Sequence, residues 1–176
     1  MSDAIRLRHA RPADASALAA FARASFAETY TPSHDAARIQ THCQSVLADA
    51  AVHAWLTDPE RPLLLAEDAG KLVGFVQWQR APAPVPTRHA VEVKRLYVAT
   101  RAHGRGLGRR LLDDARAAAV ADHADLLWLC VYAGNARALR FYASYGFAEI
   151  GRVPYTFVDQ TEDDLALGLR LAHAPP

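Results

Sequence analysis

The sequence predicts a mixed α/β fold, in which a central sheet carries helices on its faces. Short stretches that alternate apolar and polar residues, or are continuously apolar, indicate strands. Longer stretches with apolar residues three or four positions apart lie between them and indicate helices. The chain has 176 residues, 51% of them hydrophobic, which is enough to bury the core of one domain. We expect a single domain over residues 1–172 and a frayed tail over 173–176.

The N-terminal half is predicted to begin with a strand at residues 4–10 and a helix whose first turn contains Pro12. A second helical stretch follows over residues 36–56. Residues 61–80 read as two strands joined by a tight turn, which is the pattern of a hairpin. The proline-rich segment 81–87 cannot form a central strand or a helix, so we expect a long loop there.

The C-terminal half continues the alternation of strands and helices. Asn135 is suited to cap the start of a helix, and Gly146 to stop that helix in a left-handed conformation. The expected elements are a strand at 90–98, a helix from Leu107, a buried strand at 125–132, a helix at 135–147, and closing strands at 148–158 and 163–171.

Composition narrows the class of protein. The formal net charge of +1 argues against a dominant nucleic-acid surface, which is usually strongly basic. Cys43 and Cys130 show no metal-ligand spacing, and Cys130 lies in an apolar run, so it reads as a small core residue. We read His34, His42 and His53 as surface residues rather than ligands, and we expect no metal. No signal-peptide core and no membrane-spanning run is present, so we expect a cytoplasmic protein that binds no membrane.

The segment RAHGRGLGRRLL, residues 101–112, lies between a predicted strand and a predicted helix. The amides of a first helical turn lack intrahelical partners, and glycine lets a backbone approach a ligand closely. Together they form an anion site suited to phosphate. The glycine spacing and the lack of Gly-Lys-Ser/Thr do not favour a dinucleotide or Walker loop, and an ordinary glycine-rich turn stays open. Four arginines add positive charge and forked donors: Arg101, Arg105, Arg109 and Arg110.

Two motifs, about 30 residues apart, resemble the GCN5-related N-acetyltransferase (GNAT) family. VKRLYVATRAHGRGLGRRLL contains Arg101-x-x-Gly104-x-Gly106, which is similar to that family's acetyl-CoA motif. LWLCVYAGNARALRFYASYGF is similar to the family's following strand, asparagine and helix ending in Tyr-x-x-x-Gly-Phe. The resemblance covers nearly the whole chain.

This resemblance implies a mostly antiparallel sheet with helices on both faces and one splayed parallel strand pair that binds acetyl-CoA. In the family, the strand before the glycine-rich turn carries a bulge, and the pantetheine arm pairs with its backbone. The turn's amides hold the pyrophosphate. The residues so assigned to acetyl-CoA are Leu96, Tyr97, Val98, Arg101, His103, Gly104, Arg105, Gly106, Leu107, Gly108, Arg109, Asn135 and Tyr142.

The resemblance also implies catalytic roles. Tyr142 matches the tyrosine that many members use as general acid toward the departing thiolate; the alternative is a core aromatic, as we read Tyr145. Glu92 is the best candidate for a base, acting through a water, although a solvent-facing strand carboxylate is equally compatible with its position. Asn135 can contact the cofactor, cap its helix, or do both.

The acceptor is expected to be a small primary amine. Glu28 and Tyr30 lie where the family builds its acceptor wall. FAETY and VPYTFVDQTEDDLALGL are similar to a bacterial subgroup that acetylates polyamines, and an acidic groove would attract a polycation. The alternative for the acidic cluster is a solvated turn. A homodimer is compatible with the resemblance, whereas a nucleic-acid partner is not expected. A non-catalytic acyl-CoA sensor on the same fold stays the alternative function. The acidic cluster comprises Asp159, Glu162, Asp163 and Asp164.

Overall fold

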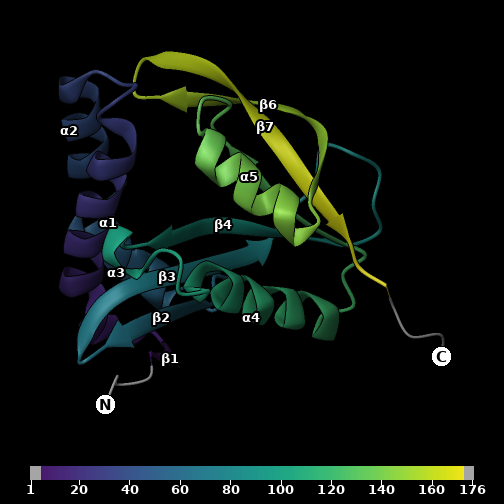
Figure 1. The fold of residues 1–176 in the computed structure, drawn as a ribbon, viewed down its shortest axis with the longest axis horizontal. Helices are drawn as coiled ribbons and strands as arrows, with labels where there is room; N and C mark the ends of the chain where they lie inside the picture. Colours follow the sequence, from purple (N-terminus) through teal and green to yellow (C-terminus); the bar gives the residue numbers. More distant parts are fainter. Residues whose placement is uncertain (1–4, 173–176) are drawn as a thin grey trace. The chain divides into compact units, whose positions relative to one another are not determined.

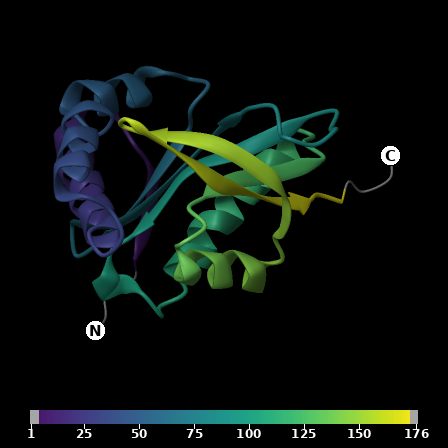
Figure 2. The same ribbon diagram turned by 90° about the horizontal axis from the view of Figure 1, so that it is seen from above.

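The computed structural model, drawn in Figures 1 and 2, describes residues 5–172. The chain divides into two units. Unit 1 comprises Met1–Gln77 and Arg95–Leu111, and unit 2 comprises Trp78–Lys94 and Leu112–Pro176. The predicted tail at 173–176 lies outside the described residues. No helix within residues 5–172 is long and apolar enough to cross a membrane.

Unit 1 contains the N-terminal helices and an antiparallel arrangement of its first three strands. The hairpin turn predicted between the second and third strands is present, with positive φ at Ala69 (48°) and Gly70 (75°). Its elements are β1 (Arg6–His9), η1 (Pro12–Asp14), α1 (Ala15–Tyr30), α2 (Ala36–Ser45), α3 (Asp49–Thr57), β2 (Leu63–Asp68), most of β3 (Lys71–Arg80), the end of β4 (Ala90–Val98), η2 (Thr100–Ala102) and the start of α4 (Leu107–Ala121).

The single helical stretch predicted over residues 36–56 is in fact two helices, α2 and α3. The break brings Leu47 into the core, where it is 1% exposed. Arg23 of α1 donates hydrogen bonds to the Leu47 carbonyl and to Asp49, both at 2.9 Å. Tertiary contacts with α1 therefore favour the interruption, which local periodicity does not reveal.

Helices cover both faces of β3 within unit 1. Consecutive strand residues point to opposite faces, and Phe75 meets Phe21 of α1 edge to face, with ring centroids 6.2 Å apart. On the other face, a Cβ at Gly74 would lie 3.2 Å from Leu111 Cδ1 and 3.4 Å from Leu107 Cδ2. The absence of a side chain at Gly74 therefore lets the start of α4 pack closely on the strand.

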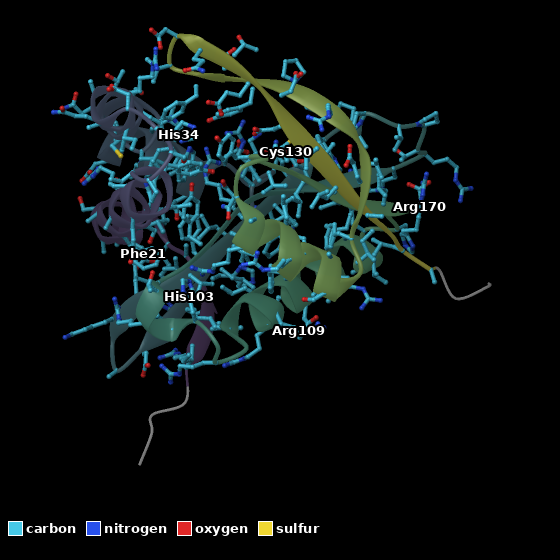
Figure 3. All side chains as sticks on the ribbon, turned by 45° about the horizontal axis from the view of Figure 1, so that its top comes forward. Phe21, His34, His103, Arg109, Cys130 and Arg170 are labelled. Atoms are coloured by element: carbon cyan, nitrogen blue, oxygen red, sulfur yellow. The ribbon has the colours of Figure 1, made fainter. Side chains whose placement is uncertain are left out.

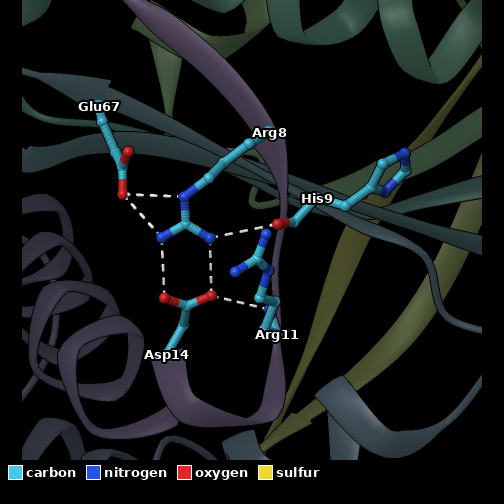
Figure 4. A network of polar contacts seen from close by, with 5 residues as sticks. All are labelled: Arg8, His9, Arg11, Asp14 and Glu67. Atoms are coloured by element: carbon cyan, nitrogen blue, oxygen red, sulfur yellow. Dashed lines mark hydrogen bonds and ion pairs between the residues drawn. The ribbon is translucent and has the colours of Figure 1, made fainter.

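A polar network fixes β1 to its surroundings (Figure 4). The Arg8 guanidinium donates two hydrogen bonds of 2.8 Å to Asp14 in η1 and bonds of 2.7 and 3.1 Å to Glu67 in β2. Asp14 also accepts from the backbone amide of Arg11 at 2.7 Å. We call these three side chains, Arg8, Asp14 and Glu67, the Arg8 network.

Unit 2 contains the parallel strand pair and the C-terminal hairpin. The proline-rich loop lies over the sheet here, because Ala81, Ala83 and Val85 pack against the core around Trp128, and Trp128 Nε1 donates to the Ala81 carbonyl at 3.2 Å. The elements are the end of β3, the start of β4, the rest of α4, β5 (Leu126–Val131), α5 (Ala136–Tyr145), β6 (Ala148–Phe157) and β7 (Gln160–Arg170).

The strands are hydrogen-bonded in the order β1-β2-β3-β4-β5-β7-β6. In unit 2, β4 and β5 are parallel, whereas β5–β7 and β6–β7 are antiparallel. Helix α5 ends as predicted, at a left-handed Gly146 with φ of 113°. The predicted fold class, a mixed and mostly antiparallel sheet with one parallel pair and helices, is confirmed.

Candidate active site

The glycine-rich turn, residues 101–109, has the backbone of an anion site. Gly104 and Gly106 both have φ of 73°, and a Cβ at either would meet nothing within 4 Å. The first intrahelical bond of this end of α4 runs from the Arg110 amide to the Gly106 carbonyl, at 3.1 Å. The amides of residues 107–109 come before that bond, where the positive end of the helix dipole lies. These features fit a pyrophosphate bound by backbone N–H groups.

Arginine side chains of the segment 101–112 contact protein groups rather than solvent alone. Arg101 donates to the Leu72 carbonyl at 2.8 Å, and Arg110 donates to the Ile5 carbonyl at 3.1 Å. Arg105 pairs with Asp68 at 2.6 Å. A phosphate would compete with these partners for the guanidinium donors, whereas the amides of residues 107–109 precede the first intrahelical bond of α4. Figure 3 labels His103 and Arg109 on this segment, and His103 Nε2 donates to the Val98 carbonyl at 2.8 Å.

Strand β4 contains one extra residue relative to β3. In unit 1, Phe75 of β3 stacks on Tyr97 of β4 with ring centroids 5.1 Å apart, and Gln77 of β3 accepts a hydrogen bond from Arg95 of β4 at 2.7 Å. Between these two contacts each strand advances by two residues. In unit 2, Gln79 donates to Glu92 at 2.9 Å. From Gln77 to Gln79 is two steps, whereas from Arg95 back to Glu92 is three, so β4 bulges between Glu92 and Arg95.

Two backbone bonds place the same extra residue in β4. Ala81 donates to the Ala90 carbonyl at 3.3 Å, and Ala99 donates to the Val73 carbonyl at 2.9 Å. Between these bonds β3 advances eight residues, 73 to 81, and β4 advances nine, 90 to 99.

The parallel register of β4 with β5 runs from Ala90↔Leu126 to Glu92↔Trp128, so it ends directly before the bulge. Beyond it, Leu96, Tyr97 and Val98 are half-buried. A strand that leaves its ladder at a bulge presents backbone N–H and C=O groups to a ligand.

Glu92 is buried, with 5% of its surface exposed, so it is not the solvent-facing carboxylate that its strand position also allowed. Gln79 Nε2 donates to its Oε2 at 2.9 Å, and Lys94 Nζ donates to its Oε1 at 3.1 Å. A carboxylate has about four lone-pair sites, so two donors fix its orientation without exhausting its capacity to accept.

Cys130, which Figure 3 labels, lies close enough to this carboxylate for its pKa to be affected by it. Burial raises the pKa of the Cys130 thiol to about 11, with the charges of Glu92 and Asp164 as further causes. Glu92 and Asp164 are therefore both close enough to influence the thiol. Cys130 is half-buried in β5 rather than fully enclosed in the core.

The acidic cluster predicted near the C-terminus divides in the structure. Asp164 is buried at 7% exposure, whereas Asp159 and Asp163 are exposed. Alternation along β7 separates Asp163 and Asp164 onto opposite faces. The sequence run therefore does not form one acidic surface, although the buried member lies near Cys130.

Helix α5 positions Asn135 and two tyrosines. Asn135 is the N-cap, and its Oδ1 accepts from the Ala138 amide at 3.0 Å. Tyr142 is buried, and its ring meets Phe147 with centroids 5.7 Å apart. Tyr145, read from the sequence as packing, also makes a specific bond: its hydroxyl donates to Asp113 of α4 at 2.6 Å.

In the N-terminal helices, Glu28 is exposed and Tyr30 is half-buried. Tyr30 lies against Phe26, with centroids 4.4 Å apart, and Phe26 stacks on His42 at 4.3 Å. The expectation that His42 lies on the surface was wrong, because α2 turns this imidazole toward α1 and leaves it 6% exposed.

Sequence reasoning also missed Arg95. Its guanidinium lies 3.8 Å from the ring centroid of Trp55 in α3 and donates to Gln77. One signal was available: Gln77 and Gln79 are polar residues two apart in an otherwise apolar strand, a spacing that calls for polar partners on the adjacent strand.

Comparisons with known proteins agree with this geometry. Residues 19–147 match the acetyltransferase (GNAT) family. An uncharacterised N-acetyltransferase of Mycobacterium bovis is 31% identical over 154 residues, which cover 88% of this chain and 96% of that protein. The mycothiol acetyltransferase of Jonesia denitrificans is 35% identical over 109 residues, 62% of this chain and 31% of that one.

Among solved structures, PaiA N-acetyltransferase from Thermoplasma acidophilum, in complex with coenzyme A, superposes with a TM-score of 0.80. It is 19% identical, and the match covers 96% of this chain and 99% of that chain. None of these three proteins establishes the polyamine subgroup that the sequence favoured. The family match and the Mycobacterium bovis relative, which is covered over 96% of its length, decide the class: this chain belongs to the acetyltransferase (GNAT) family and is an N-acetyltransferase.

Proposed function

We propose that the protein transfers the acetyl group of acetyl-CoA to a small primary amine, by direct attack while both substrates are bound. The observation that carries this proposal is the bulged strand β4 followed by a turn with two glycines at φ of 73°. The bulge offers backbone groups to an amide-rich arm, and the turn offers amides to a diphosphate.

The residues proposed to hold acetyl-CoA follow from these two features. The backbones of Leu96, Tyr97 and Val98 bind the pantetheine arm, and the amides from His103 to Arg109 bind the pyrophosphate. Asn135 uses Oδ1 for its helix cap, so its amide nitrogen is the group that donates to the cofactor.

Acetyl-CoA supplies an acyl group activated as a thioester. The neutral amine forms a bond to the carbonyl carbon, and the carbon–sulfur bond breaks. Tyr142 donates a proton to the departing sulfur and regains one from the attacking nitrogen, so the phenol is restored. Because a free amine is mostly protonated near neutral pH, a base must first remove one proton, and we assign that step to Glu92 acting through a water.

The enclosure of Glu92 suits this role. Gln79 and Lys94 hold the carboxylate in one orientation, and burial keeps bulk water away. General acid–base groups contribute most when their position is fixed. Glu28 and Tyr30 are proposed to line the acceptor side, with polyamines as the acceptors that the sequence favoured.

The experiment is an incubation with acetyl-CoA and a pool of amines that includes spermidine, with products identified by mass and acetyl-CoA binding measured by calorimetry. We expect binding and an acetylated amine. Binding without product across a broad amine panel would instead favour the acyl-CoA sensor.

Two glycine variants separate binding from stability. Gly106→Ala and Gly70→Ala both place a side chain at a φ near 73–75° with open space around it, so both carry a similar backbone strain of about 1–2 kcal/mol. Only Gly106 lies in the glycine-rich turn. We expect acetyl-CoA affinity to fall by about tenfold, or about 1.4 kcal/mol, in Gly106→Ala alone. Equal affinity in the two variants would contradict the assignment of this turn.

A further inference from the structure

The chain carries almost all of its positive charge on arginine. Lysine and arginine together number 20, and only Lys71 and Lys94 are lysines. A guanidinium stays protonated in proteins, whereas the ε-amino group of lysine can lose a proton and act as a nucleophile. The side chains that can accept an acetyl group on a primary amine are therefore restricted to these two positions.

One of the two lysines contacts the proposed base. Lys94 lies in β4, within unit 2, and its Nζ donates a hydrogen bond of 3.1 Å to Oε1 of Glu92. Glu92 is the carboxylate to which we assign proton removal from the acceptor amine. The chain thus places a primary amine of its own on the group proposed to activate amines. Lys71, by contrast, begins β3 in unit 1, directly after the hairpin turn at Gly70.

The two side chains of the Lys94–Glu92 pair differ in exposure. The Lys94 side chain is 43% exposed, whereas that of Glu92 is 7% exposed. The lysine amine is carried on a flexible four-carbon stem, while the buried carboxylate is also held at Oε2 by a bond of 2.9 Å from Gln79. The pair therefore joins a movable amine to a fixed base, which suits a transfer to that amine.

The ion pair has an opposing effect as well, because it favours the protonated form of the amine. For a partly exposed pair this preference is about fivefold. A positioned general base, in contrast, accelerates a reaction by about 100-fold or more. The balance favours acetylation of Lys94 over that of a lysine with no base beside it.

We propose that Lys94 is a self-acetylation site, to which the protein transfers the acetyl group of acetyl-CoA when no acceptor amine occupies Glu92. This inference rests on the proposed function. The bond from Nζ to the acetyl carbon forms, and the carbon–sulfur bond of the thioester breaks. The ammonium group becomes an amide and so releases two protons. One passes through Glu92 to water, and the other goes to the departing sulfur.

Acetylation changes the surroundings of the base. It removes the positive charge of Lys94, and the amide N–H that remains can still donate to Glu92. The acetylated side chain then takes the place of an acceptor amine at the carboxylate. Transfer to added amines should therefore slow by about tenfold or more in the modified protein, as expected when a general base is blocked.

The test incubates the purified protein with acetyl-CoA and no added amine, and follows each lysine by peptide mass mapping. We expect Lys94 to be acetylated at least about tenfold faster than Lys71, an exposed lysine that measures the background chemical reaction. In urea the two rates should become similar, because the contact with Glu92 is lost on unfolding.

An acceptor should protect Lys94, since both amines use Glu92. The amines are those of the pool that contains spermidine, and the one acetylated fastest is added at increasing concentration. It should slow acetylation of Lys94 and leave that of Lys71 unchanged. Equal rates at Lys94 with and without this amine would overturn the shared use of Glu92.

Three variants assign the reaction. Lys94→Arg keeps the positive charge but cannot be acetylated, so the fast modification should disappear. Glu92→Gln keeps the amine but removes the base, so the rate at Lys94 should fall to the rate at Lys71. Lys71→Arg is the matched control and should leave acetylation of Lys94 unchanged. Thermal unfolding confirms that each variant is folded.

The outcomes separate the two proposals. An acetylated amine product with equal rates at Lys94 and Lys71, or fast acetylation of Lys94 that persists in Glu92→Gln, overturns self-acetylation at this pair and leaves transfer to small amines standing. Selective acetylation of Lys94 that depends on Glu92, with no product from any added amine, supports the site and overturns the proposed transfer to small amines. Neither selective acetylation nor an amine product overturns both.

Discussion

Two arginines of unit 1 are fixed in opposite ways. In the Arg8 network, hydrogen bonds to Asp14 and Glu67 raise the pKa of Arg8 above its usual value, and the bond from Arg8 lowers the pKa of Asp14. The Arg95 guanidinium, by contrast, lies 3.8 Å from the ring centroid of Trp55 and donates a hydrogen bond to the neutral amide of Gln77. Ion pairs with carboxylates join Arg8 and β1 to neighbouring elements, whereas a ring contact and a neutral hydrogen bond contribute to holding Arg95 in place.

Helix α5 in unit 2 repeats the contrast with two tyrosines. The Tyr145 hydroxyl donates to the Asp113 carboxylate, and burial together with this bond raises the pKa of Tyr145 to about 12. Tyr142 is positioned through its ring, by edge contacts with Phe141 at 5.1 Å and Phe147 at 5.7 Å. We expect Tyr145 to contribute to stability through its hydroxyl bond, and we keep Tyr142 as the residue proposed for the general acid.

The largest expected effect is on Tyr142. Tyr142→Phe removes the proton donor to the leaving sulfur while keeping the ring contacts, so kcat should fall by about 100-fold or more, the usual contribution of a general acid. Acetyl-CoA affinity should change little, as measured by calorimetry. Tyr145→Phe, one helical turn further on, is the matched control and should keep kcat. A Tyr142→Phe enzyme as fast as the wild type would remove Tyr142 from the mechanism.

The pKa of His42 provides a test of the charge on Arg95. Burial and the charge of Arg95 lower the pKa of His42 from 6.5 to about 4. As the pH falls, this histidine takes up a proton near pH 6.5 in the unfolded chain but only near pH 4 in the folded protein. The contribution of His42 to the free energy of unfolding is therefore present above pH 6.5 and is lost as the pH falls toward 4. Over this range the free energy of unfolding falls with pH by at most about 1.4 kcal/mol per pH unit, for a total loss of about 2–3 kcal/mol.

Urea unfolding across this pH range measures that loss, and His42→Phe, which keeps a ring against Phe26, should abolish it. His53→Phe, at an exposed position, is the control and should keep the wild-type slope. In Arg95→Gln, NMR titration should show a higher pKa for His42. An unchanged His42 pKa in that variant would mean that the charge of Arg95 is already cancelled within its surroundings.

The Arg8 network should show the next effect. Arg8→Met leaves two partly buried carboxylates without their donor, and we expect a loss of about 2 kcal/mol in the free energy of unfolding. Arg6→Met, at an exposed position of the same strand, should cost much less.

The difference between the wild type and Arg8→Met should shrink in acid. The pKa of Asp14 is lowered from 3.8, so its contribution is present above that pH and is lost as the pH falls below it. Equal losses in Arg6→Met and Arg8→Met at neutral pH would show that Arg8 is not the structural arginine of the pair.

The sequence predicted well those features that depend on residues close together in the chain. The two positive-φ glycines of the turn, the Asn135 cap and the Gly146 stop each arise within a few residues, so local patterns reveal them. The buried strand β5 was equally visible as an unbroken apolar run.

Features that depend on distant partners were missed. The burial of His42 depends on which face α2 presents to α1, and the break at Leu47 depends on bonds from Arg23. The resemblance implied a bulge in the strand before the glycine-rich turn, but its position in β4 emerges only when the partners of Gln77 and Gln79 on the next strand are known. No single stretch of sequence contains that comparison, so the contacts of Arg95 with Trp55 and Gln77 could not be predicted.

The smallest expected effect completes the contrast between the tyrosines. Tyr145→Phe removes the bond to Asp113 and should lower the free energy of unfolding by about 1 kcal/mol. Because the pKa of Tyr145 is raised from 10 to about 12, the folded state keeps its proton after the unfolded chain has lost it. That contribution is present below pH 10 and is lost as the pH rises toward 12. Urea unfolding of wild type and variant should therefore converge in this range, and a constant difference would show that the ring, rather than the hydroxyl bond, stabilises this end of α5.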